Sequence, residues 1–97
     1  MADNPDTLDA FVDRALKQFG ARGYVPTVFL DMRTRWGTKE AIARLVASGD
    51  IQSGLQRLKS LNFLDLSMEA AVLKFPGEFR KDIREAAEFR LRQWAGR

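Results

Sequence analysis

The stretch from Asn62 to Leu73 constrains the fold of this chain more than any other segment. It is densely apolar, and Ser67 in its middle suits a helix N-cap, because a serine hydroxyl accepts a hydrogen bond from a free backbone N–H of the first turn. Leu66 before the cap and Glu69 in the first turn fit the same helix start. The expected inward face consists of Met68, Ala71, Val72 and Phe75. Leu73 lies off that face, so this helix is apolar on more than one side and is expected in the middle of a helical bundle.

A first helix is predicted near the N-terminus. Asn4 is a good N-cap residue, and Pro5 suits the first helical position. The apolar residues that follow recur at helical spacing: Leu8, Phe11, Val12, Ala15, Leu16 and Phe19. Gly20 and Gly23 are expected to end this helix, because glycine adopts positive φ without strain.

A second helix is expected after Pro26, because proline is tolerated in the first turn of a helix. Phe29, Met32 and Trp36 lie on one face at helical spacing and are predicted to point inward. Gly37 is expected to end the helix.

Two further short helices are expected, the first capped by Thr38 and ended by Gly49, the second capped by Asp50. Their predicted inward residues are Ile42, Leu45 and Val46, then Ile51, Leu55, Leu58 and Leu61. Such a pair invites a helix-turn-helix interpretation, but the turn glycine comes two residues too late for that motif. Residues 54–64 resemble the recognition helix and first wing strand of a winged helix. A helix start follows, however, where a β-hairpin is needed, so neither DNA-binding motif fits.

A longer last helix is predicted from about Phe79 to Trp94. Its inward stripe consists of Ile83, Ala87, Leu91 and Trp94, and Phe89 falls well away from that stripe. The sequence therefore predicts an all-α fold. We expect a compact bundle of five or six short helices with a longer C-terminal helix, in one domain spanning residues 1–97.

Composition argues against catalysis. The chain has no Cys and no His, so thiol catalysis, zinc–thiolate sites and the commonest general base are excluded. The acid–base candidates are carboxylates such as Asp31, Asp50, Asp65 and Glu69, and their spacing does not indicate a paired or metal-binding cluster. No glycine-rich phosphate loop is present. We expect a protein that is not an enzyme and that needs no cofactor and no metal.

The net charge of +3 is unevenly distributed. Residues 1–20 carry two basic and four acidic side chains, whereas residues 74–97 carry seven basic and four acidic ones. A basic C-terminal end favours an acidic partner, nucleic acid included, although a solvated helix face of alternating sign explains the same residues. The candidate nucleic-acid contacts are Arg33, Arg35, Trp36 and Lys39, together with Arg80, Lys81 and Arg84 of the last helix. Alternatively, Trp36 packs at a helix end with arginine side chains covering it, which is the interpretation we favour.

Apolar residues outside the predicted core suggest a protein interface. Phe89 on the basic last helix is the main candidate, with Leu73 and Arg92. The leading hypothesis is a non-enzymatic interaction or accessory module that binds a protein partner or a second copy of itself. The alternative is nucleic-acid binding. No apolar run reaches the length of a membrane span, and residues 1–20 are acidic, unlike a signal peptide, so a cytoplasmic location is expected.

The order of helix starts and stops resembles a group of small bacterial helical proteins for which no activity is established. The resemblance covers roughly residues 20 to 92. It rests on Gly23-Tyr24-Val25-Pro26 with Phe29, Met32 and Gly37, then Ala41, Leu45, Gly54-Leu55 and Leu58, and finally Leu64 to Leu73. That group has an Asp-Leu-Ser/Thr segment, an apolar helix and an arginine-rich last helix. Val25 departs from the polar residue expected before the proline. The resemblance implies the architecture and no particular function.

Overall fold

The computed structural model describes residues 7–48 and 52–95, and over these residues the chain is all-α. The α-helices are α1 (Leu8–Ala21), α2 (Thr27–Trp36), α3 (Thr38–Ala47), α4 (Gln52–Ser60), α5 (Met68–Lys74) and α6 (Lys81–Ala95). Two short 3-10 helices, η1 (Leu64–Leu66) and η2 (Pro76–Glu78), flank α5. The predicted all-α bundle with a longer C-terminal helix is confirmed, and no strand occurs in the described residues.

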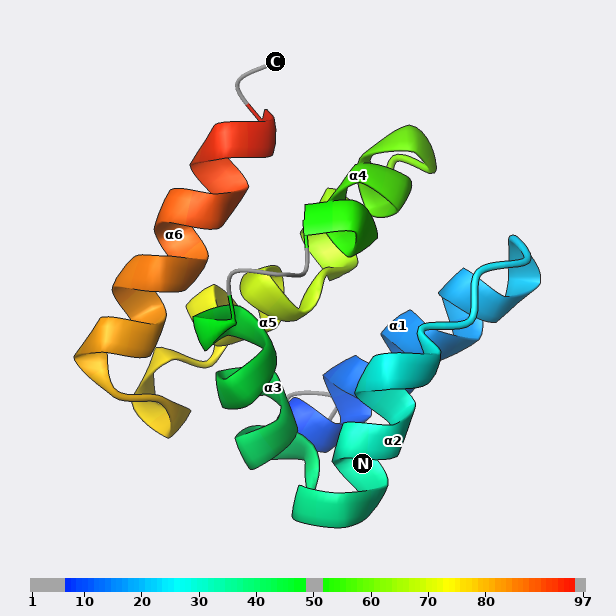
Figure 1. Ribbon diagram of the computed structural model, residues 1–97. Helices are drawn as coiled ribbons and strands as arrows, with labels where there is room; N and C mark the ends of the chain where they lie inside the picture. Colours follow the sequence, from blue (N-terminus) through cyan, green and yellow to red (C-terminus); the bar gives the residue numbers. More distant parts are fainter. Residues whose placement is uncertain (1–6, 49–51, 96–97) are drawn as a thin grey trace.

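The helix α5 lies in the middle of the molecule, with α6 along one side and α1 with α2 along the other (Figure 1). It packs against α1, α3 and α6. Ser67 is its N-cap, as predicted: the side-chain hydroxyl accepts a hydrogen bond of 3.0 Å from the backbone N–H of Ala70. The core around α5 is formed by Phe11, Val12, Ala15, Phe19, Phe29, Ala41, Ile42, Leu45, Val46, Leu58, Met68, Ala71, Val72, Phe79, Ile83 and Ala87.

The start of α1 differs from the prediction. Thr7 is the N-cap, and its hydroxyl accepts a hydrogen bond of 3.1 Å from the backbone N–H of Ala10. The predicted cap Asn4 and the following Pro5 lie outside the described residues. At the other end Gly23 has φ of +81°, and the N–H of Tyr24 donates to the carbonyl oxygen of Phe19 over 2.9 Å. This turn brings the aromatic ring of Tyr24 back onto the end of α1.

The junction between α2 and α3 corrects a second prediction. Gly37 is the cap shared by the two helices, with φ of +86°, and no side chain caps α3. Thr38 was expected to be the cap, but its hydroxyl accepts a hydrogen bond of 2.8 Å from Nε of Arg33 instead. The positive φ of Gly37 turns the chain so sharply that Thr38 is already the first helical residue.

Several predictions fall on parts of the chain that are not described. Gly49, Asp50 and Ile51 lie outside the described residues, as do the side chains of Leu55 and Trp94. The last helix begins at Lys81 and not at Phe79. Phe79 has extended backbone angles and is itself buried, so it contributes to the core from the linker before α6.

Candidate binding surfaces

The predicted cluster around Trp36 has its charges neutralised within the fold. Arg33 holds two aspartates of α1, because its Nη1 lies 2.9 Å from Oδ1 of Asp13 and its Nη2 lies 3.4 Å from Oδ1 of Asp9. Its Nε is used by Thr38. The Arg33 guanidinium therefore fastens α2 to α1 and to the start of α3.

The two other cations of the cluster are also paired. Nε of Arg35 lies 3.2 Å from Oδ2 of Asp31 one turn earlier on α2. Nζ of Lys39 lies 3.5 Å from Oε1 of Glu78 on η2. These exposed pairs are weak, yet each places a negative charge where a phosphate contact needs a free cation.

Trp36 does not point inward as predicted, and 43% of its surface is exposed. The guanidinium carbon of Arg44 lies 4.2 Å from the centroid of its ring, and Nε of Arg44 donates over 2.9 Å to Glu40. An arginine thus covers Trp36, but it comes from α3 and not from the residues beside Trp36 in the sequence. Gly37 causes the difference, because it folds α3 back along α2.

The candidate basic residues at the start of α6 and just before it also have partners. Nε of Arg80 lies 3.2 Å from Asp82, and Nζ of Lys81 lies 3.8 Å from Glu85. Arg84 instead donates from Nη1 to the backbone carbonyl oxygens of Phe79 and Pro76, over 2.7 and 3.3 Å. The structure does not bring these residues together with the Arg33 cluster into one unpaired basic surface.

The candidate interface residues do reach the surface. Phe89 on α6 is 58% exposed, and Leu73 on α5 is also exposed. Arg92 lies one turn from Phe89 and pairs with Glu88, with 3.0 Å between Nη2 and Oε2. The outward face of α6 therefore carries an aromatic ring among charges of both signs.

A second cluster of arginines and aromatic rings joins the end of α1 to the end of α4. The guanidinium carbon of Arg22 lies 5.8 Å from the ring centroid of Phe63, and that of Arg57 lies 5.8 Å from the ring centroid of Tyr24. Both rings pack on Phe19, with centroid separations of 5.5 Å to Tyr24 and 5.8 Å to Phe63. We call Arg22, Tyr24, Arg57 and Phe63 the basic aromatic end.

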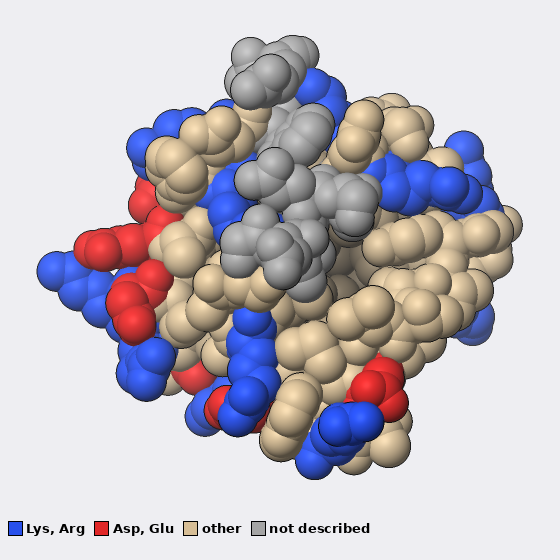
Figure 2. All heavy atoms as spheres, in the orientation of Figure 1, with Lys and Arg blue, Asp and Glu red and all other residues tan. Residues whose placement is uncertain are grey.

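The arginines of the basic aromatic end make no ion pair with any described acidic residue, in contrast to Arg33, Arg35 and Lys39. Burial raises the pKa of the Tyr24 hydroxyl above its ordinary value of 10.0; the nearby Arg57 opposes this rise, and Glu69 adds to it. Figure 2 shows basic atoms without acidic atoms at its upper right, where α1 ends and α4 lies, whereas both signs mix over α6 at the left.

The sequence pattern does not reveal this cluster, because its two halves are far apart in the chain. Residues 22–24 meet residues 57–63 only because α4 is followed by a tight turn in which Asn62 has φ of +67°. In that turn the N–H of Phe63 donates to the carbonyl oxygen of Leu58 over 2.7 Å. A sequence signal does exist, because asparagine is one of the few residues that adopt positive φ readily.

Two exposed aliphatic side chains follow Tyr24 of the basic aromatic end in the sequence. Val25 follows Tyr24 directly and is 58% exposed, and Val28 in the first turn of α2 is 64% exposed. Val25 occupies the place where a polar residue was expected before Pro26. Its exposure therefore places an apolar group where the fold does not need one.

The buried ion pair between Glu69 and Arg90 was also missed. Oε2 of Glu69 lies 2.8 Å from Nε of Arg90, and only 3% and 11% of the two side chains are exposed. Nη1 of Arg90 donates to the carbonyl oxygen of Ser48 over 3.0 Å, while its Nη2 has no hydrogen-bond partner in the described part of the chain. The pair joins α5 and α6 to the end of α3. Glu69 was assigned to a helix start alone, because periodicity cannot show that an acid is buried opposite an arginine far along the chain.

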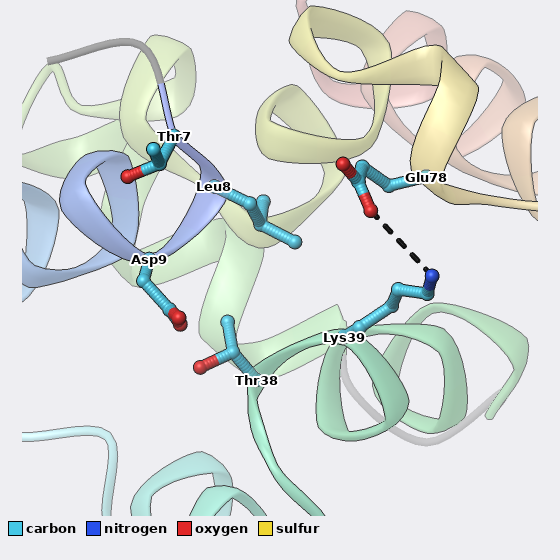
Figure 3. Close-up of a pocket in the computed structure, with 6 residues that line it drawn as sticks. All are labelled: Thr7, Leu8, Asp9, Thr38, Lys39 and Glu78. Atoms are coloured by element: carbon cyan, nitrogen blue, oxygen red, sulfur yellow. Dashed lines mark hydrogen bonds and ion pairs between the residues drawn. The ribbon is translucent and has the colours of Figure 1, made fainter. Parts of the chain in front are cut away.

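A pocket of about 290 Å³ lies between the starts of α1 and α3 and η2. Thr7, Leu8, Asp9, Thr38, Lys39 and Glu78 line it (Figure 3). The pKa of Asp9 is lowered from 3.8, because Thr38 and then Arg33 hydrogen-bond its carboxylate, while burial opposes the shift. The charged residues that line the pocket are already paired: Lys39 pairs with Glu78 across the opening, and Asp9 pairs with Arg33.

No family model, no curated protein and no solved structure matches this chain. The described residues include no group of three or more acidic side chains placed to hold a metal ion. None of the described helices is both long enough and apolar enough to cross a membrane.

Proposed function

We propose that this chain is a non-enzymatic protein-interaction module. The observation that carries the proposal is a set of large apolar side chains that stay exposed although the fold has a well-formed core. In the described residues these are Val25, Val28, Trp36, Leu73 and Phe89. Single exposed apolar residues are ordinary on protein surfaces. Here, however, Val25 and Val28 lie three residues apart, the first just before α2 and the second in its first turn, and Val25 directly follows Tyr24 of the basic aromatic end. The lack of His and Cys in the sequence supports binding over catalysis.

The outward face of α6 supports self-association as a part of this proposal. Phe89 is flanked by the pairs Lys81–Glu85 and Glu88–Arg92, so that face carries both signs of charge. A face with both signs is complementary to a second copy of itself across a two-fold axis. One aromatic residue gives a small contact, so we expect a weak dimer that forms at high protein concentration.

Light scattering over a range of concentrations, combined with capture of partners on the immobilised protein, tests the proposal. We expect Phe89→Ala to shift any monomer–dimer equilibrium toward the monomer, and Leu73→Ala tests whether the exposed side chain on α5 contributes to the same contact. We expect Val25→Ser with Val28→Ser to reduce the recovery of partners. A wild-type protein that stays monomeric, and whose captured partners are the same for all three variants, would refute the proposal.

Nucleic-acid binding is the alternative function. The acidic partners of Arg33, Arg35 and Lys39 weigh against the cluster first expected to make it. Arg22 and Arg57 favour it, because no described acidic residue pairs with them and guanidinium groups bind phosphates. A titration with duplex and single-stranded DNA at low salt separates the two functions, since contacts to phosphates weaken steeply as salt rises. No binding at low salt would eliminate this alternative.

The expected compartment belongs to the same proposal. We propose that the module acts in the cytoplasm, an expectation supported by the absence of Cys from the sequence. Fractionation of cells that produce the tagged protein tests this expectation.

A further inference from the structure

We infer that the basic aromatic end, with the adjoining Val25, binds an acidic amphipathic segment of a protein partner. In such a complex, carboxylates of the segment meet the guanidinium groups of Arg22 and Arg57, and its apolar side chains cover Val25. This inference rests on the proposed function as an interaction module and names the chemistry of the partner.

The two guanidinium groups are positioned by aromatic rings, and no described acidic residue pairs with them. Each lies 5.8 Å from the centroid of an aromatic ring, and both rings are packed on Phe19. A ring beneath a guanidinium restricts its motion and leaves its N–H edges free, and those edges match a carboxylate in bidentate geometry. Arg44 over Trp36 shows the contrasting case, since its Nε already donates to Glu40.

The charge around these groups favours an acidic partner. The nearest acidic residue in the sequence is Asp65, two residues beyond Phe63, and no ion pair links it to Arg22 or Arg57 in the described chain. Elsewhere on the surface, exposed cations such as Arg35, Lys39 and Arg92 pair with acidic residues of the fold. The basic aromatic end therefore presents two guanidinium charges that no described acidic residue neutralises, and these charges attract an acidic ligand.

The exposed apolar groups favour a peptide over a nucleic acid. Binding of single strands relies on stacking of bases on open aromatic faces. The rings of Tyr24 and Phe63 are only partly exposed, and each has Phe19 and an arginine as neighbours. The exposed group beside them is the aliphatic Val25, which is suited to contact leucine-like side chains of a partner.

A library of random sixteen-residue peptides displayed on phage, selected on the full chain, tests the inference without a known partner. We expect the selected peptides to combine Asp or Glu with large aliphatic residues. Synthetic copies of the selected peptides are then titrated at two salt concentrations, and the dissociation constant is expected to rise with salt.

Two pairs of substitutions with the same change of net charge locate the site. Arg22→Gln with Arg57→Gln is expected to raise the dissociation constant roughly tenfold or more, because two charge-assisted contacts are lost. Arg35→Gln with Lys39→Gln removes two cations that already pair with Asp31 and Glu78, so the dissociation constant is expected to change less than about twofold. Val25→Ser is expected to weaken binding, because it removes the exposed apolar group beside the arginines' rings. Circular dichroism of each variant checks that the helices are retained.

The possible outcomes decide between the alternatives. Enrichment of acidic, aliphatic peptides with the expected loss in the Arg22/Arg57 variant supports the inference. Enrichment of neutral or basic peptides, or equal losses in both charge-matched variants, overturns it and leaves the interaction module standing on another surface. Tighter binding of a twelve-nucleotide single strand than of the selected peptides overturns it in favour of nucleic acid. If no peptide is enriched and the capture experiment also recovers no partner, the inference and the proposed function both fail.

Discussion

The helices α5 and α2 are both rich in apolar residues, but the fold uses them differently. α5 has seven residues and buries four of them, Met68, Glu69, Ala71 and Val72. α2 has ten residues, five of them large and apolar, and buries only Phe29. The difference comes from position, since α5 contacts helices on several sides whereas α2 packs chiefly against α3. Apolar content alone therefore does not identify the core, since Val28 and Trp36 of α2 stay exposed.

The largest expected effect on stability comes from replacing Glu69, the buried acidic residue of α5. Glu69→Ala leaves Arg90 buried without its carboxylate, and removing one partner of a buried ion pair typically costs about 3–5 kcal/mol. Glu88→Ala breaks the exposed pair with Arg92 and is expected to cost less than about 1 kcal/mol. Urea unfolding measures both values. Equal losses would mean that Glu69 is not a buried anchor of α5.

Truncation of one methionine in each helix compares their contributions to stability directly. Met68 on α5 is buried, and Met68→Ala is expected to lower the free energy of unfolding by about 2–5 kcal/mol. Met32 on α2 is only partly buried, and Met32→Ala is expected to cost about 1 kcal/mol. Chemical denaturation of the two variants under one set of conditions checks the order. A Met32 variant that loses more stability than the Met68 variant would show that α2 belongs to the core.

Substitutions at the helix N-termini are expected to show a smaller difference in stability between α5 and α2. Ser67→Ala removes the hydrogen bond to the N–H of Ala70 and is expected to cost about 1 kcal/mol. The cap residue of α2 is Pro26, which makes no side-chain hydrogen bond to the helix. Thr27→Ala at the start of α2 is therefore expected to change stability by less than about 0.5 kcal/mol. Thermal unfolding followed by circular dichroism is sufficient to separate the two variants.

The smallest expected effect on stability comes from an exposed residue of α2. Val28→Ser is expected to change the free energy of unfolding by less than about 0.5 kcal/mol, because this side chain is mostly in solvent already. The same substitution is expected to reduce the capture of partners. A loss of stability comparable with that of Met68→Ala would instead assign Val28 to the fold.

The fold was predictable where periodicity and caps act locally. The apolar stripe of α1, the Ser67 cap and the central place of α5 all follow from short-range patterns in the sequence. The predictions that Thr38 caps α3 and that Trp36 points inward were wrong for one reason. Gly37 takes a positive φ, which shifts the start of α3 and leaves the end of α2 exposed.

The candidate sites were less predictable, because they depend on pairs that are distant in the sequence. Arg33 belongs to a dense basic cluster in the sequence, but in the fold it pairs with Asp9 and Asp13. Arg22 and Arg57 looked unremarkable in the sequence, and the fold brings them to aromatic rings at one end of the molecule. Charge patterns along the sequence do not reveal which cations remain unpaired, since pairing is decided by packing.

Native-state hydrogen exchange tests most directly the claim that α5 belongs to the stable core of the fold while α2 is held less tightly. We expect the backbone amides of Ala71 and Phe75, which bond within and at the end of α5, to exchange only through global unfolding. The amides of α2 are expected to exchange through local openings of lower free energy. Equal protection of the two helices at the level of global unfolding would contradict this division of the molecule.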